Sequence, residues 1–211
     1  MFHLLASKEF KMRLFATVFL IFILVGCTEN PQVSNLRKSL AKVDSVDSVI
    51  SLLPLDSINS VRIRLNEAKD EVRWLGSDSS VSFIREDAEI INELSKASRW
   101  LKDAPNRING MNSEILRCKL QIEGLINVIE SGATIDANGD TIDDAYLTEN
   151  VKREIAAVNN LLSHYQETVT YVTKGLECDR DGWEAIDSLL TVKRAMWARG
   201  IAGEDTNSDE K

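Results

Sequence analysis

Residues 151–176, VKREIAAVNNLLSHYQETVTYVTKGL, place apolar side chains at alternating intervals of four and three residues. The series is Val151, Ile155, Val158, Leu162, Tyr165, Val169, Val172 and Leu176. Because an α-helix has about 3.6 residues per turn, this spacing forms one narrow apolar seam, which is typical of a helix in a bundle or coiled coil. The stretch therefore predicts a long helix that packs along one face.

Two earlier stretches carry the same pattern. The first is Ile58, Val61, Leu65, Ala68, Val72 and Leu75, and the second is Ile108, Met111, Ile115, Cys118, Ile122, Leu125 and Ile129. The chain also has only 3 prolines and 10 glycines among its 211 residues, which favours helix over sheet. We expect an all-α fold in which these apolar seams face one another.

Prolines and polar stretches divide the chain into helices. A first helix is predicted over 34–53 and ends at Pro54, and the next ends at Gly76–Ser80. We expect another break around Gly175–Gly182, followed by a last helix with Trp183, Ile186, Leu190 and Trp197 on one side.

The segment 80–131 contains Pro105. Leu101 and Ile108 are seven residues apart, so the apolar seam keeps its phase past the proline, which favours a kink between two nearly collinear helices over a reversal of the chain. We expect an elongated antiparallel bundle of five to six helices in three long kinked rods, 34–75, 80–131 and 145–198. A compact bundle is the alternative. The helical domain would cover 34–199, followed by a disordered acidic tail, 200–211.

One stretch departs from the helical pattern. Thr-Ile-Asp occurs at 134–136 and again at 141–143, on either side of Asn138-Gly139. Asn-Gly favours a tight turn because both residues accept positive φ. We therefore predict a small β-hairpin at one tip of the bundle.

The amino-terminal segment has a different composition. Leu14–Val25 is almost entirely apolar and follows Lys8, Lys11 and Arg13. A helix that spans a bilayer needs about 20 apolar residues, so a shorter run behind cations is typical of an export signal.

Leu24-Val25-Gly26-Cys27 resembles the lipobox of bacterial lipoproteins, in which the peptide is cut before the cysteine and the thiol carries a diacylglycerol. The resemblance implies a signal peptide, 1–26, a lipidation site at Cys27 and a short tether, 27–33. Some lipoproteins carry an acidic run after the cysteine that directs them to the cell surface, but here only Glu29 is acidic. We expect a lipid anchor in the cell envelope, at the periplasmic face of the outer membrane. The mature domain resembles no family that we can name.

The charge of the chain limits its partners. Without residues 1–26 it has 22 basic and 32 acidic residues, a net charge of −10, and Lys and Arg form no cluster in the sequence. Such a chain repels phosphate backbones, so nucleic acid is not an expected partner.

Motifs for catalysis are absent from the sequence. After residue 26 the single histidine is His164, one position off the apolar seam, so sites built on several histidines are excluded. There is no Gly-x-Ser-x-Gly nucleophile motif and no glycine-rich phosphate loop. We expect no enzymatic activity and no cofactor, with His164 as a surface residue.

Asp136, Asn138 and Asp140 are weak candidates for a metal site, because calcium loops begin with a similar Asp-x-Asn-x-Asp pattern. The similarity fails at Thr141, where a calcium loop needs glycine, and at Leu147, where it needs a bidentate glutamate. We expect a solvated turn without a metal.

The two remaining cysteines are Cys118 and Cys178. In the elongated bundle they would lie about 30 Å apart, whereas a disulfide needs Cα atoms within about 7 Å. We expect both to be free, with Cys118 buried in the apolar seam.

These observations favour a non-enzymatic scaffold or adaptor that binds an envelope protein through its helix faces. Trp183 and Trp197 are candidates for the docking face, because aromatic residues dominate interface hot spots, although core packing is the alternative role. Self-association through the apolar seams is also open. The contrasting hypothesis is a ligand-binding protein or hydrolase with a cleft between the helices, near Trp100 and Trp183.

Overall fold

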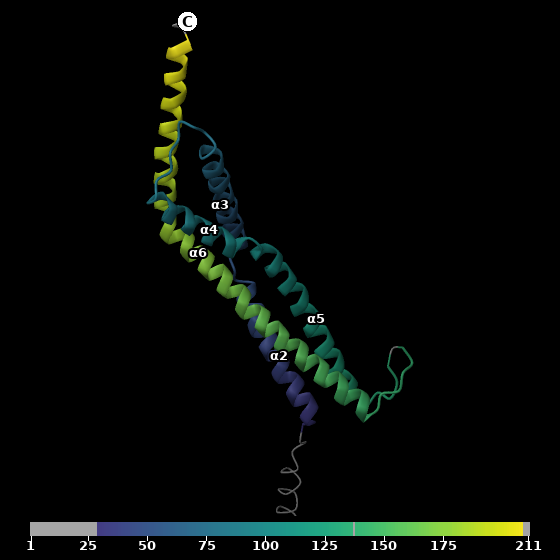
Figure 1. The fold of residues 1–211 in the computed structure, drawn as a ribbon. Helices are drawn as coiled ribbons and strands as arrows, with labels where there is room; N and C mark the ends of the chain where they lie inside the picture. Colours follow the sequence, from purple (N-terminus) through teal and green to yellow (C-terminus); the bar gives the residue numbers. More distant parts are fainter. Residues whose placement is uncertain (1–28, 137, 209–211) are drawn as a thin grey trace, which may run out of the picture.

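The computed structural model describes residues 29–136 and 138–208. Its helices are α2 (Pro31–Ile50), α3 (Leu55–Leu75), α4 (Asp87–Leu101), α5 (Ala104–Ser131) and α6 (Asp144–Ser208). The prediction of an all-α bundle is confirmed. Figure 1 shows an elongated molecule in which α6 runs beside α2 and α5 in one half and beside α3 and α4 in the other.

The first helix begins where the local sequence can satisfy its free backbone groups. The side chain of Asn30 accepts a hydrogen bond from the N–H of Gln32 at 2.8 Å, and Pro31 occupies the first turn, where its missing N–H costs nothing. The helix therefore begins three residues before the predicted start at 34, inside the segment expected to be a tether.

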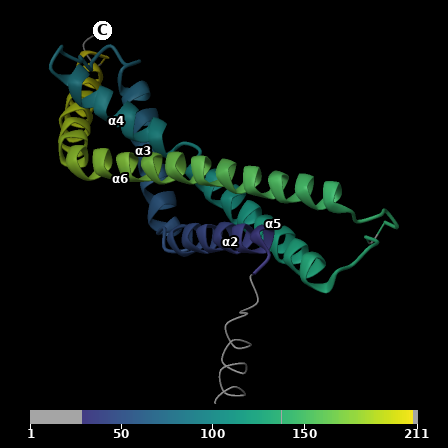
Figure 2. The ribbon, with the colours of Figure 1, turned by 90° about the horizontal axis from the view of Figure 1, so that it is seen from below.

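The break at Pro105 is a kink. α4 ends at Leu101 and α5 begins at Ala104, and α5 continues away from α4 instead of folding back beside it in both views (Figures 1 and 2). The proline lies in the first turn of α5, where it is tolerated. The prediction of two helices joined by a kink is confirmed.

The predicted break around Gly175–Gly182 is wrong, because α6 is one continuous helix of 65 residues that bends (Figure 2). The apolar seam continues through this region if two charged residues are counted as members: Leu176, Asp179, Trp183, Ile186, Leu190, Lys193 and Trp197. A Cβ atom at Gly175 would overlap with the side chain of Leu101. This glycine therefore allows α4 and α6 to approach closely and does not end the helix.

The same helix runs on to Ser208 and so includes part of the tail, 200–211, for which we expected disorder. A helix that is already packed extends at low cost, because each added residue forms one more backbone hydrogen bond.

The predicted β-hairpin is also wrong. Among the described residues this segment forms only an isolated antiparallel bridge between Ile135 and Thr141, and it contains no strand. The tight turn is present, since the N–H of Asp136 donates to the carbonyl of Asp140 at 2.9 Å. However, Ile135 is 63% exposed, so the segments on either side of the turn have no second layer of structure to pack against among the described residues.

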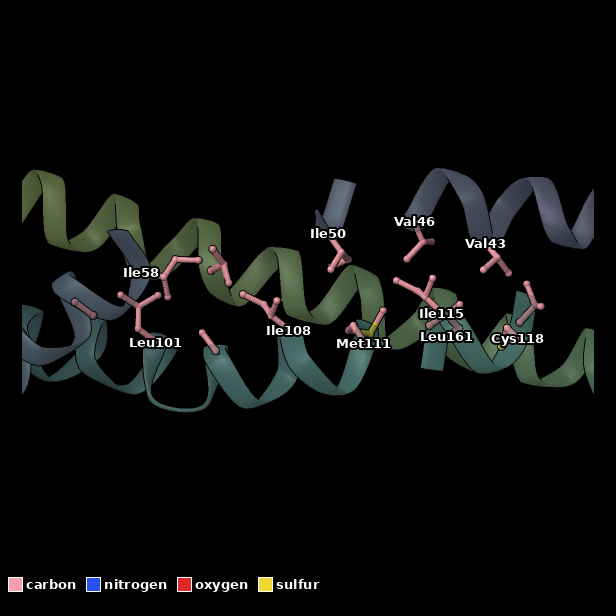
Figure 3. Packing of buried hydrophobic residues seen from close by; sticks show 14 of the residues in the cluster. Val43, Val46, Ile50, Ile58, Leu101, Ile108, Met111, Ile115, Cys118 and Leu161 are labelled. Atoms are coloured by element: carbon pink, nitrogen blue, oxygen red, sulfur yellow. The ribbon is translucent and has the colours of Figure 1, made fainter. Parts of the chain in front are cut away.

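The core is a row of apolar side chains between the rods. Figure 3 shows Val43, Val46 and Ile50 of α2 on the opposite side of the core from Met111 and Ile115 of α5. Burial of these side chains is the main source of helix stability, because single helices are marginal in water. The apolar seams predicted from the sequence therefore pack against one another within this chain.

Both cysteines are free, as predicted, and Cys118 is fully buried in this core. Cys178 on α6 is only partly buried.

Candidate functional site

Cys27 and the rest of Leu24-Val25-Gly26-Cys27 lie outside the described residues. Within the described part of the chain, no helix is long and apolar enough to cross a membrane.

The residues of the weak metal candidate are used to stabilise a turn. Oδ1 of Asp136 accepts hydrogen bonds from the N–H groups of Asn138 at 2.8 Å and Asp140 at 2.9 Å, and Oδ2 accepts one from the hydroxyl of Tyr146 at 3.3 Å. The hydrogen bonds from the backbone lower the pKa of the Asp136 carboxyl below its usual value. Within 29–136 and 138–201, no group of three or more His, Cys, Asp or Glu side chains could hold a metal ion.

The two candidate docking tryptophans are packed against α3. The guanidinium of Arg64 lies over the ring of Trp183, 4.0 Å from its centroid, and Trp197 meets Trp74 edge to face at 4.9 Å between ring centroids. Both tryptophans of α6 are half-buried and contact the hydrophobic core. They do not form one exposed aromatic pair. Trp74 is the more exposed partner, at 51%.

Two of the ion pairs that join α6 to the neighbouring helices involve charged residues of its apolar seam. Arg64 donates through Nη2 to both carboxylate oxygens of Asp179, at 2.7 and 2.6 Å, and Lys193 reaches Asp87. Asp179 and Lys193 are both buried, and both occupy positions of the apolar seam. The sequence signal that could have found them is a charged residue at a position where the pattern requires an apolar one.

A groove lies between α3 and α4, next to the break before α5, and has a volume of about 600 Å³. Polar and charged residues from three parts of the chain line it: Arg62, Asn66 and Lys69 of α3, Ser95, Ser98 and Arg99 of α4, and Lys102, Asp103 and Asn106 at the connection to α5. We call this the basic groove, because it contains four cations and one carboxylate. No sequence pattern indicated it, since the cations are spread over forty residues.

No described acidic side chain pairs with the cations of the basic groove. Among the described residues, Arg62, Lys69, Arg99 and Lys102 form no ion pair. Nε of Arg62 is buried and has no hydrogen-bond partner there. At the floor, Nζ of Lys69 donates to Oγ of the buried Ser98 at 3.1 Å, and Ser98 donates to Oδ1 of Asn66 at 3.3 Å. This arrangement presents positive charge and hydrogen-bond donors to one cavity.

A second groove, of about 290 Å³, lies between α5 and the beginning of α6. Leu120 lines it and is 59% exposed, as is Leu116 one turn earlier on the same face of α5. Glu154 also lines the groove; it is buried, its Oε2 has no hydrogen-bond partner among the described residues, and its nearest cation is Arg117 at 3.8 Å. We call Leu116, Leu120 and Glu154 the α5–α6 face.

His164 is exposed on α6, as predicted from its place beside the apolar seam.

Comparison with known proteins gives no match among the family models, the curated proteins or the solved structures.

Proposed function

We propose that this chain is a bacterial lipoprotein of non-enzymatic adaptor or scaffold type. In this proposal residues 1–26 are removed as a signal peptide and Cys27 is acylated, which anchors the helical domain at the periplasmic face of the outer membrane. The support for the anchor is the order of cations, apolar run and Leu24-Val25-Gly26-Cys27 in the sequence.

The observation that carries the adaptor role is the α5–α6 face. Leu116 and Leu120 expose apolar surface in adjacent turns, beside Glu154. Oε2 of Glu154 has no hydrogen-bond partner among the described residues, and Arg117 lies 3.8 Å from it. A buried acceptor without a partner is costly, and a donor from another molecule would satisfy it. The face suits an amphipathic helix of an envelope protein that supplies apolar side chains and one Lys or Arg.

The hydrolase alternative has less support. General acid–base catalysis needs carboxylates or a histidine that converge on a cleft. The basic groove, which lies near the predicted waist, holds four cations and a single carboxylate, Asp103. His164 lines a separate groove of about 410 Å³ between α5 and α6 together with one carboxylate, Glu114. That carboxylate is already paired with Arg117 at 2.7 Å.

The anchor can be tested by labelling cells with radioactive palmitate. We expect label in the wild-type protein and none in Cys27→Ser, because that substitution removes the only thiol of the lipobox. Equal labelling of both proteins, or label in neither, would contradict the lipoprotein assignment.

The adaptor role can be tested by cross-linking in intact cells, followed by purification of the full-length chain and identification of the linked proteins. We expect one abundant partner, reduced in Cys27→Ser and lost in Leu116→Ser/Leu120→Ser. Ile63→Ser is the matched control, because Ile63 is a similarly exposed apolar residue, at 53%, on α3. A partner that the control loses equally, or products that contain only this chain, would overturn the proposal.

A further inference from the structure

We propose that the basic groove between α3 and α4 is a binding site for a phosphate group. This inference goes beyond the adaptor role, because it concerns a different surface and requires no protein partner.

The charge distribution is the first argument. The chain has a formal net charge of −8, yet four cations and one carboxylate line this groove, which leaves three net positive charges there. Acidic side chains elsewhere pair with Arg37, Arg64, Lys119 and Arg194, whereas none of the described ones pairs with the cations of the groove. Like charges around one cavity repel one another, and a bound anion would turn that repulsion into attraction.

The hydrogen-bonding groups are the second argument. Ser95, Ser98, Asn66 and Asn106 add neutral polar groups to the charged donors of the groove. Ser98 is only 5% exposed and holds Lys69 in place, so the floor is ordered before any ligand arrives. Nε of Arg62 is a buried donor without a partner in the described chain. Donors of this number suit a ligand with several acceptor oxygens.

The beginning of α5 is the third argument. Asp103 is the N-cap residue of this 28-residue helix, but its side chain makes no capping hydrogen bond. Asp103 and Asn106 line the groove, so the positive end of the helix dipole lies at the same cavity as the cations. A phosphate group carries up to two negative charges and three strong acceptor oxygens, whereas a carboxylate carries one charge and two oxygens, so a phosphate group matches the four cations and the donors of the groove better.

The phosphate could belong to a soluble molecule or to a lipid headgroup, and the chemistry of the groove is the same for both. The test is a calorimetric titration of the full-length chain, in neutral detergent micelles and phosphate-free buffer, with sodium pyrophosphate. A parallel titration uses mixed micelles that contain phosphatidic acid, whose headgroup is a phosphate monoester, with zwitterionic phosphatidylcholine as the control lipid.

The variant for this test is Arg99→Gln/Lys102→Gln. Both side chains are exposed, so the helices should remain intact, which circular dichroism verifies. The matched control is Lys38→Gln/Lys42→Gln, which removes the same charge from exposed positions of α2 outside the groove. We expect the groove variant to bind pyrophosphate at least about tenfold more weakly than wild type, and the control to bind within about twofold.

Each outcome decides the proposal. Pyrophosphate binding that only the groove variant loses supports a soluble phosphate ligand. Binding of phosphatidic acid alone, lost in the same variant, supports a lipid headgroup as the source. Binding of neither ligand, or equal weakening in the control, overturns the phosphate site and leaves the adaptor role untouched, because that role depends on the α5–α6 face.

Discussion

Nζ of Lys193 lies 2.5 Å from Oδ2 of Asp87, and both side chains are buried. The ammonium group of Lys193 also donates a hydrogen bond to the carbonyl of Ser82 at 2.8 Å. The carboxylate of Asp87 accepts a further hydrogen bond from the N–H of Ile84 at 2.9 Å. This pair connects the last part of α6 to the beginning of α4 and to the loop before it. An ion pair and its hydrogen bonds, in addition to apolar packing, therefore attach α6 to the loop before α4.

Replacing Lys193 by methionine should destabilise the protein by about 3 kcal/mol, because it leaves the carboxylate of Asp87 buried without its cation. Lys152→Met is the control: Lys152 is exposed on α6 and forms no ion pair with a described residue, so we expect a change below about 0.5 kcal/mol. Urea unfolding of the full-length chain, followed by circular dichroism, measures both. Equal midpoints for the two variants would contradict the stabilising role of the pair.

The same pair predicts a pH dependence. Burial opposes ionisation of Asp87, but hydrogen bonds from Lys193 and from the N–H of Ile84 outweigh it, so the pKa of this carboxyl is lowered. The pKa of an aspartate in the unfolded chain is about 3.9. Because the folded-state pKa of Asp87 is lower, its carboxylate stabilises the folded protein fully at pH values above the unfolded pKa. This stabilisation is lost as the pH falls through the folded-state pKa. We expect the stability difference between wild type and Asp87→Asn to be largest above about pH 5 and to shrink toward pH 2. A difference that is constant with pH would refute this account.

Two glycines of long helices should respond to alanine in opposite ways. Gly175→Ala should cost about 2 kcal/mol, because the added methyl group overlaps with the buried side chain of Leu101. Gly110→Ala should stabilise by about 0.5 to 1 kcal/mol, because nothing lies within 4 Å of the added carbon and alanine favours helix. Thermal unfolding of both variants measures these effects. A neutral Gly175→Ala would mean that α4 and α6 do not pack as closely as described.

The two cysteines of the helical domain should differ in reactivity. Cys118 is fully buried, and burial raises the pKa of its thiol, so iodoacetamide should reach it only after unfolding. Cys178 is partly exposed and should react in the native protein. Mass spectrometry of peptides from native and urea-treated protein measures both rates. Equal rates in the native state would contradict the packing of α5.

Calcium should not bind to the turn at Asp136. Both oxygens of this carboxylate already accept hydrogen bonds from within the turn or from Tyr146, and Asn138 and Asp140 are exposed. We expect no heat on titration with millimolar calcium and no change in the unfolding temperature. A saturable signal that Asp136→Asn abolishes would show that the turn is a calcium site.

Much of the fold could be predicted from the sequence, because the apolar periodicity and the breaks are local properties. The apolar seams of 58–75, 108–129 and 151–176 all belong to helices, and the kink at Pro105 follows from the missing N–H of proline. The errors arose where tertiary packing, and not the local sequence, determines whether a helix ends. The glycines near 175 were interpreted as a break, whereas a neighbouring helix packs against the first of them.

The charged residues of the apolar seam show the same limit. Asp179 and Lys193 stand at apolar positions of the pattern, so periodicity alone did not place them in the core. Their burial is tolerated only because Arg64 and Asp87, each about a hundred residues away in the sequence, lie within hydrogen-bond distance.

Helix periodicity and net charge depend only on the order and number of residues, so the helical fold and the acidic surface could be predicted without coordinates. The basic groove was decided by the tertiary structure. Arg62 and Lys69 lie about thirty to forty residues from Arg99 and Lys102, and only the packing of α3 against α4 gathers these cations around one cavity. Electrostatic interactions depend on distance in space, and that distance is set by the fold.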